Sequence, residues 1–275
     1  MYRNTFLSVM FLACCFNGSL CAQSDAQIYE RTCDAKTYPF SDPSPVATPN
    51  NSYYPYFRFD GFSMQAQEKQ WKMVVLENDY VKLTVTPEIG GKIWGAIDKV
   101  NNKEFVYTNG VVKFRDVAMR GPWTSGGIEF NFGIIGHAPT CSTPIDYLTK
   151  KNVDGSVSCH IFSYEWITRT VWNVEINLPK DKAYFTTHTT WFNQSSIDQP
   201  YYQWMNAGYA TKTGTRFYYP GTYSIGHSGD LHPYPIDEEG RDVSWYDNNN
   251  FGASKSLHII GDYNDYLSLI HISEP

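Results

Sequence analysis

Hydrophobic and polar residues alternate along much of the chain after residue 70. In KMVVLENDYVKLTVTPEIGGKIWGAIDK, for example, Val81, Leu83 and Val85 alternate with lysine and threonine. A period of two residues places these apolar side chains on one face of a strand and the polar ones on the other. PEIGG interrupts the pattern with a proline and paired glycines, so we expect a tight turn between neighbouring strands there.

The same alternation returns in SVSCHIFSYEWITRTVWNVEINL and in AYFTTHTTWFNQS, which are rich in β-branched and aromatic residues. No apolar stripe at helical spacing extends beyond about two turns. We therefore predict an all-β fold, a large antiparallel sandwich or barrel that occupies residues 56–266. Residues 23–55 include YPFSDPSPVATPNNSYYPY, whose prolines and small polar residues predict an arm without strands.

Length and charge limit the class of ligand. A chain of 275 residues, 42% of them hydrophobic, is long enough for one large domain. Its 22 Lys and Arg are scattered and outnumbered by 28 Asp and Glu, giving a net charge of -6. A nucleic acid or an anionic membrane surface needs a basic face, so we expect a neutral or small ligand instead.

The N-terminus has the features of a secretory signal. Residues 1–22 begin with Arg3, continue with an apolar run and end in SLCA, a plausible cleavage site. The run is too short to predict a membrane span. We expect a secreted or periplasmic protein; the alternative is a lipoprotein modified at Cys14 or Cys21.

Three cysteines remain after this segment, Cys33, Cys141 and Cys159. An odd number cannot all pair, and their spacing lacks a metal signature such as CxxC. We interpret them as buried thiols or as one disulfide and a thiol. No metal ligand and no cofactor is predicted.

The densest candidate chemistry lies in RGPWTSGGIEFNFGIIGHAP, residues 120–139. Its glycines permit close backbone approach or positive φ, which suits the lining of a cleft. In IEFNF the period of two places Glu129 beside Asn131, with a hydrophobic layer behind them. Arg120, Trp123 and His137 complete a mixture that fits a sugar, since aromatic faces suit its C–H groups and polar groups its hydroxyls. The alternative is a structural ion pair between Glu129 and Arg120.

Two further segments contribute candidates. In YYQWMNAGY, Trp204 and Asn206 share one strand face, although a lone Trp in a sheet is more often a core residue. YPGTYSIGHSGDLHPYPIDEEGRDVSWYDNNNFGAS is a long polar loop that contains His227. Its HSGDLH spacing is weak support for a metal, and we favour a solvated loop. GxSxG, GxxxxGKS, the dinucleotide fingerprint and HExxH are absent, which disfavours the corresponding enzyme classes.

Several of these motifs together resemble a known family. LENDYVKLTVTPEIGGKIWGAIDK, RGPWTSGGIEFNFGIIGHAPT, VDGSV, YYQWMNAGY and YPGTYSIGH are similar to the DUF5107 family of the galactose mutarotase-like superfamily, over about residues 55–266. The resemblance implies an antiparallel β-supersandwich, incomplete at its C-terminus, whose concave sheet binds carbohydrate. Superfamily enzymes use a histidine acid and a carboxylate base, and the carboxylate often comes late in the chain. Residues 267–275, LSLIHISEP, resemble translated adapter sequence, so we expect a non-native tail.

The sequence thus predicts a secreted carbohydrate-active protein, with an oligosaccharide or polysaccharide as partner. We expect a glycoside hydrolase-like enzyme; the alternatives are a sugar epimerase and a noncatalytic carbohydrate-binding module. The expected catalytic residues are Glu129 and His137. The expected sugar-binding residues are Arg120, Trp123, Asn131, Trp204, Asn206 and His227.

Overall fold

The computed structural model describes residues 24–39, 63–116, 122–134, 137–200, 202–209, 213–218, 221–225 and 230–249. The predicted signal at 1–22, the expected tail at 267–275, and the candidate residues Arg120 and His227 lie outside these ranges. No helix in the described ranges is long and apolar enough to cross a membrane.

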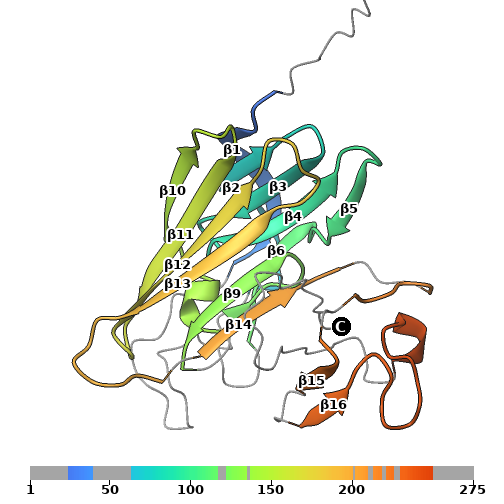
Figure 1. Cartoon of the computed structure of the whole chain (residues 1–275). Coiled ribbons are helices and arrows are strands. Elements are labelled where there is room, and N and C mark those ends of the chain that lie inside the picture. The colour runs from blue at the N-terminus through green and yellow to red at the C-terminus, as the bar shows by residue number, and fades with distance from the viewer. Residues whose placement is uncertain are drawn as a thin grey trace, which may run out of the picture.

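Within the described residues a sheet of eight strands forms the larger layer (Figure 1). Its order is β14-β9-β4-β3-β2-β1-β6, and β5 pairs with β4. The strands are β1 (Gln27–Tyr38), β2 (Gln67–Glu77), β3 (Val81–Thr86), β4 (Lys92–Asp98), β5 (Lys103–Val106), β6 (Val111–Lys113), β9 (Ile128–Gly133) and β14 (Tyr202–Ala207). The pairings are antiparallel except that of β1 with β6, which is parallel.

A second, antiparallel sheet has the order β10-β11-β12-β13. Its strands are β10 (Asp146–Lys151), β11 (Val157–Glu165), β12 (Thr170–Leu178) and β13 (Thr186–Asn193). The described short elements are β7 (Arg115–Asp116) paired with β8 (Pro122–Trp123), β15 (Tyr223–Ile225) paired with β16 (Leu231–Pro233), and the 3-10 turns η2 (Pro139–Cys141) and η3 (Tyr246–Asn248). The expected all-β fold is confirmed.

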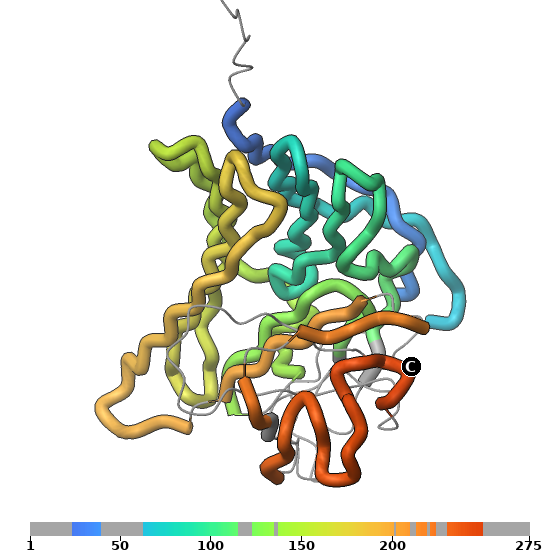
Figure 2. Tube along the Cα trace, turned by 45° about the vertical axis from the view of Figure 1, so that its right-hand side comes forward, coloured from blue at the N-terminus to red at the C-terminus, as the bar shows by residue number. Residues whose placement is uncertain are grey.

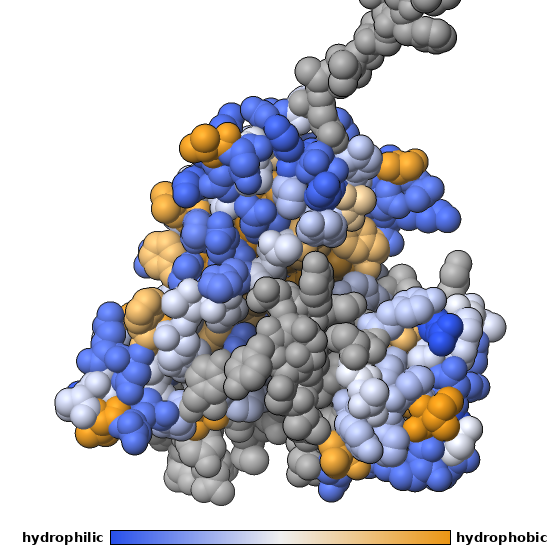
Figure 3. Space-filling model, viewed as in Figure 1, coloured by the Kyte–Doolittle hydropathy of each residue, from blue (hydrophilic) through white to orange (hydrophobic). Residues whose placement is uncertain are grey.

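The core lies between the two sheets and explains the alternation in sequence. Apolar residues of β2, β3, β4, β9 and β14 meet those of β11 and β12 in one cluster of buried side chains. Phe132 of β9 stacks on Trp172 of β12 with ring centroids 4.7 Å apart. Figure 3 shows that the described face in view is mostly hydrophilic, with hydrophobic side chains in separate patches. The strands of the sandwich therefore point their apolar side chains into this core, and side chains that could form a site project from the opposite face.

The alternating segments became strands as expected, and residues 87–91 form the predicted turn between β3 and β4. The prediction of an arm without strands is wrong for Gln27–Tyr38, which form β1 and pair with β2 from Gln27 to Thr37. The prolines of the segment begin at Pro39, so QIYERTCDAKTY itself holds nothing that prevents strand pairing. Composition averaged over the whole segment concealed this strand.

The polar segment expected as a loop also has more structure than predicted. In its described part, β15 and β16 form a hairpin, and Arg241 pairs with Asp237 at 2.7 Å. Figure 2 shows this orange-to-red part of the chain below the sandwich, away from the β10–β13 sheet. Local ion pairs and turns thus order a segment that lacks an apolar stripe.

Truncating Phe132 tests the core. Phe132→Ala should lower the free energy of unfolding by about 3–5 kcal/mol, because it removes a buried ring and leaves a cavity. Phe192→Ala is the matched control, since Phe192 is 58% exposed on β13. Its exchange should cost under about 1 kcal/mol. Urea unfolding of both variants measures the difference, and equal losses would contradict the assigned faces.

Candidate functional site

The site begins on the outer face of β9. Phe130 and its apolar neighbours on that strand point into the core, so Glu129 and Asn131 project on the opposite side. The Asn131 Nδ2 donates to Glu129 Oε1 at 2.7 Å, which confirms that the two share a face. Both are buried, with Glu129 only 2% exposed. A carboxylate enclosed to this degree requires partners.

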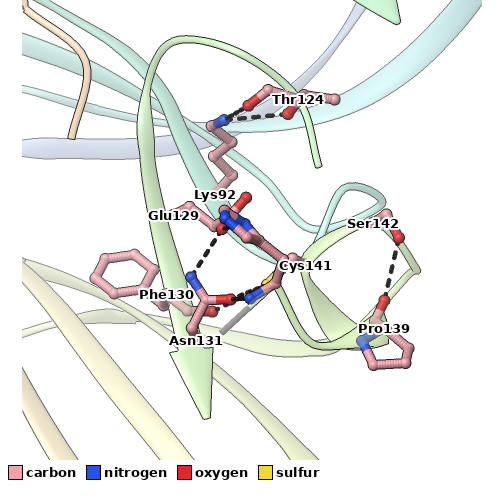
Figure 4. A network of polar contacts seen from close by, with 9 residues as sticks. Lys92, Thr124, Glu129, Phe130, Asn131, Pro139, Cys141 and Ser142 are labelled. Atoms are coloured by element: carbon pink, nitrogen blue, oxygen red, sulfur yellow. Dashed lines mark hydrogen bonds and ion pairs between the residues drawn. The ribbon is translucent and has the colours of Figure 1, made fainter. Parts of the chain in front are cut away.

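His137 supplies the main partner. Its Nδ1 lies 2.9 Å from Glu129 Oε1. Its backbone N–H donates to Asn131 Oδ1 at 2.5 Å, and the Cys141 thiol donates to the same oxygen at 2.8 Å. Figure 4 shows Asn131 between Glu129 on one side and Cys141 on the other. Two donors at Oδ1 fix the orientation of the Asn131 amide, so that its Nδ2 must face the carboxylate.

A positive φ of 56° at His137 accompanies this arrangement. Histidine is an uncommon residue in that conformation. The bond from its own backbone N–H to Asn131 holds the backbone there, while the ring reaches Glu129. One residue thus contacts both polar side chains of β9.

Lys92, at the start of β4, is a component that sequence analysis missed. Its Nζ donates to the backbone oxygen of Thr124 and to Thr124 Oγ1, the latter at 3.1 Å (Figure 4). Lys92 is 2% exposed. The signal in the sequence was the period of two, which places Lys92 with Trp94 on the face opposite the core residue Ile93.

Burial and charge shift the pKa values of both ionisable groups. Burial lowers the pKa of Lys92 to about 8, although the Glu129 carboxylate acts to raise it. Burial alone would raise the pKa of Glu129, but the hydrogen bond and charge of His137, with Lys92 and Asn131, bring it below its ordinary value. Glu129 is therefore ionised at neutral pH, and Lys92 can exchange a proton near neutrality.

Two tryptophans enclose the imidazole. In the register of β14 with β9, Trp204 lies opposite Asn131 and Asn206 opposite Glu129. The His137 ring meets Trp204 edge-on at 4.8 Å and Trp123 at 5.7 Å between ring centroids. Trp123 is only 6% exposed, so it does not present the open aromatic face expected from the sequence.

A small pocket lies beside this network, with enclosed space for about one water molecule. It is lined by Lys92, Trp123, Thr124, Gly126, Gly127, Glu129, Asn206, Ala207 and Gly208. Three buried polar atoms of the lining have no hydrogen-bond partner among the described residues: Trp123 Nε1, Glu129 Oε2 and Asn206 Oδ1. Since buried polar groups are normally paired, these three atoms indicate a place for a polar ligand or water.

Glycines make the pocket wall possible. Gly127 has φ +66°, and a Cβ there would collide with the Ile93 carbonyl oxygen and approach Lys92 Cε to 2.8 Å. A Cβ at Gly208 would lie 3.0 Å from Gly126 Cα. The Gly127 N–H donates to Tyr107 O at 2.8 Å, and the Gly208 N–H donates to Gly127 O at 2.8 Å. The glycines therefore serve close backbone approach, as the sequence suggested.

The structure brings together six of the expected site residues, namely Trp123, Glu129, Asn131, His137, Trp204 and Asn206. The proposed ion pair of Glu129 with Arg120 lies outside the described residues. In the described part of the chain no group of three or more His, Cys, Asp or Glu side chains could hold a metal. In the HSGDLH segment, His232 Nδ1 lies 3.2 Å from Glu238 Oε1. Cys33, Cys141 and Cys159 are free thiols, the last two buried.

Gly127→Ala tests the close approach. We expect it to destabilise the fold clearly more than Gly214→Ala, because both glycines have positive φ but a Cβ at Gly214 meets nothing within 4 Å. The control should cost about 1 kcal/mol, the penalty of a left-handed backbone alone. Thermal unfolding of both variants gives the difference. Equal costs would show that the backbone crossing at Gly127 relaxes freely.

Comparison with known proteins adds a family match and a fold match. A family model described as a domain of unknown function (DUF5107) matches residues 48–271. A solved structure, that of a TPR-domain containing protein from Parabacteroides distasonis ATCC 8503, superposes with a TM-score of 0.69 at 24% identity. The match covers 80% of this chain and 38% of that one, so this chain spans well under half of that protein. At this identity the likeness shows the fold alone.

Proposed function

The chain belongs to the DUF5107 family, whose function is unknown, and we propose that it is a carbohydrate-active protein of the glycoside hydrolase or sugar epimerase type. Glu129 is the catalytic carboxylate in this proposal, and His137 is its positioning residue. We also propose that its all-β fold is that of the galactose mutarotase-like superfamily.

One observation carries the proposal. Glu129 Oε1 is held by Asn131 and His137, whereas Oε2 is buried, unpartnered and part of a pocket. A carboxylate fixed through one oxygen and free at the other is prepared to accept a proton from a group that enters the pocket.

Lys92 provides a second titrating group in the same pocket. With a pKa of about 8 it is mostly protonated at neutral pH and able to donate. Glu129 can accept a proton and Lys92 can donate one, because their surroundings leave the first ionised and the second protonated near neutral pH. Such a pair is what acid–base chemistry on a sugar hydroxyl or ring oxygen requires. Among the described lining residues Glu129 is the carboxylate, so hydrolysis through two carboxylates needs a further residue.

A noncatalytic carbohydrate-binding module is the second candidate, and the enclosure of the site favours it. Glu129 and His137 are 2% and 4% exposed. The enclosed part of the pocket also has room for only about one water molecule, far less than small-molecule sites usually provide.

Glu129→Gln separates the two candidates. Gln keeps an oxygen for Asn131 and His137 but loses the charge and the proton-accepting oxygen. If the protein is an enzyme, turnover of a glycan panel by the full-length protein should fall by about 10²-fold or more, with a melting temperature within a few degrees of wild type. The control is Glu175→Gln, which exchanges a half-exposed carboxylate on β12 outside the pocket.

The outcomes differ for each candidate. Calorimetric binding of a glycan without release of reducing sugar would identify the binding module. Undiminished turnover by Glu129→Gln would remove Glu129 from catalysis. Absence of both binding and turnover for the whole panel would end the carbohydrate proposal.

The pH profile tests Lys92 as the acid. As pH rises through about 8, Lys92 loses the proton it must donate, so kcat/KM should fall with an apparent pKa near that value. Because His137, Lys92 and Asn131 hold the pKa of Glu129 below its ordinary value, the carboxylate stays ionised and activity should persist on the acid side of neutrality. A flat profile from pH 7 to 10 would exclude Lys92 as a proton donor.

A further inference from the structure

The free polar atoms of the pocket define which chemical group it can accept. An indole N–H such as Trp123 Nε1 can only donate, whereas an ionised carboxylate oxygen such as Glu129 Oε2 can only accept. Both atoms are buried and unpartnered, in residues that are 6% and 2% exposed. Asn206 Oδ1, also unpartnered, supplies a second acceptor. The unpartnered atoms of the described lining are thus one donor and two acceptors.

A hydroxyl pairs with the Trp123 N–H and with one of the two acceptors, because it accepts through its oxygen and donates its one proton. A carboxylate could accept from Trp123, but its other oxygen would face Glu129 Oε2 and Asn206 Oδ1 with no proton to share. An ammonium could donate to the acceptors but would leave the Trp123 N–H unpaired. A buried polar group left without a partner costs about 1–3 kcal/mol, so a hydroxyl, which pairs two of the three atoms, is preferred over a carboxylate, which pairs one.

Among the described lining residues, Lys92 is the one whose charge could attract an anion instead. Two of its three N–H groups already donate to Thr124, through the backbone oxygen and Oγ1. Glu129 already supplies a negative charge in the same pocket. An anion would therefore compete with a carboxylate that is fixed in place by His137 and Asn131.

We propose that the pocket is a subsite for a single neutral hydroxyl or hydroxymethyl group, selected between the Trp123 indole N–H as donor and Glu129 Oε2 as acceptor, and that it excludes carboxylate groups of the same size. Trp123 is then a hydrogen-bonding, specificity-determining residue and not a stacking platform. The inference rests on the proposed function only where it assigns the hydroxyl to a sugar.

Two small probe molecules test directly whether the pocket selects a hydroxyl over a carboxylate. Ethylene glycol and acetate are titrated at pH 7 into the full-length protein, and the indole N–H resonance of Trp123 is followed by NMR. Its signal is identified among the eight tryptophans by its absence from Trp123→Phe. We expect a saturable shift with ethylene glycol and at least about tenfold weaker binding of acetate.

Two variants show which atoms of the pocket discriminate between ethylene glycol and acetate. Trp123→Phe keeps an aromatic ring but removes the donor, so ethylene glycol binding, measured from the ligand signals, should weaken about three- to tenfold. Trp94→Phe is the matched control, since Trp94 is equally buried at 6% exposure and its Nε1 donates to Asn109 O at 3.1 Å, outside the pocket. Glu129→Gln removes the negative charge, so the preference over acetate should shrink to about threefold or less.

The wild-type ratio of the two probes decides the proposal even if a variant fails to fold. Acetate binding as tightly as ethylene glycol would overturn it and indicate an anion site. An unmoved Trp123 resonance would overturn it as well. D-glucose, D-galactose and D-mannose are titrated alongside: if ethylene glycol binds and no hexose does, the selection stands and the carbohydrate function fails. If a hexose binds but acetate competes equally, the function stands and the selection fails.

Discussion

The structure of the site depends on one constraint, which is the burial of the Glu129 carboxylate on the sheet face opposite the core. A charge removed from water must be paired and hydrogen-bonded, or it becomes neutral. Here His137, Asn131 and Lys92 together bring its pKa below the ordinary value despite the burial. His137 has a positive φ and Lys92 has a lowered pKa at the place where this charge is buried. Neither feature has a role in the packing between the two sheets.

Asn131 is the residue that transmits this constraint. Its Oδ1 accepts from the His137 backbone and the Cys141 thiol, and its Nδ2 donates to Glu129. Burial raises the pKa of the Cys141 thiol well above its ordinary value, so the sulfur stays protonated and remains a donor. Each of the three contacts fixes the direction of the others, which leaves the carboxylate one defined position and one free oxygen.

The sequence predicted the fold class and part of the site for the same reason. A period of two residues requires only local information, so the faces of β3, β9 and β14 could be predicted from their own residues. Lys92 was missed because a lysine at a strand end is usually solvated, and its burial depends on Thr124, 32 residues away. β1 was missed because its pairing with β2 joins residues separated by about forty positions, which local composition cannot show. Trp123 lies where the sequence placed it, but its burial, which closes off the open ring face expected, depends on packing that local pattern cannot show.

The free atoms of the pocket have a consequence for stability. Trp123 Nε1, Glu129 Oε2 and Asn206 Oδ1 lose their contact with bulk water on folding and gain no partner in the described part of the protein in exchange. Unpaired groups of this kind each destabilise the folded state by about 1–3 kcal/mol unless water or a ligand completes them. Any occupant that completes them binds the native state alone, and it must therefore raise the unfolding temperature in proportion to its concentration and affinity. Occupancy of the pocket between β4, β9 and β14 is consequently linked to the stability of the folded protein.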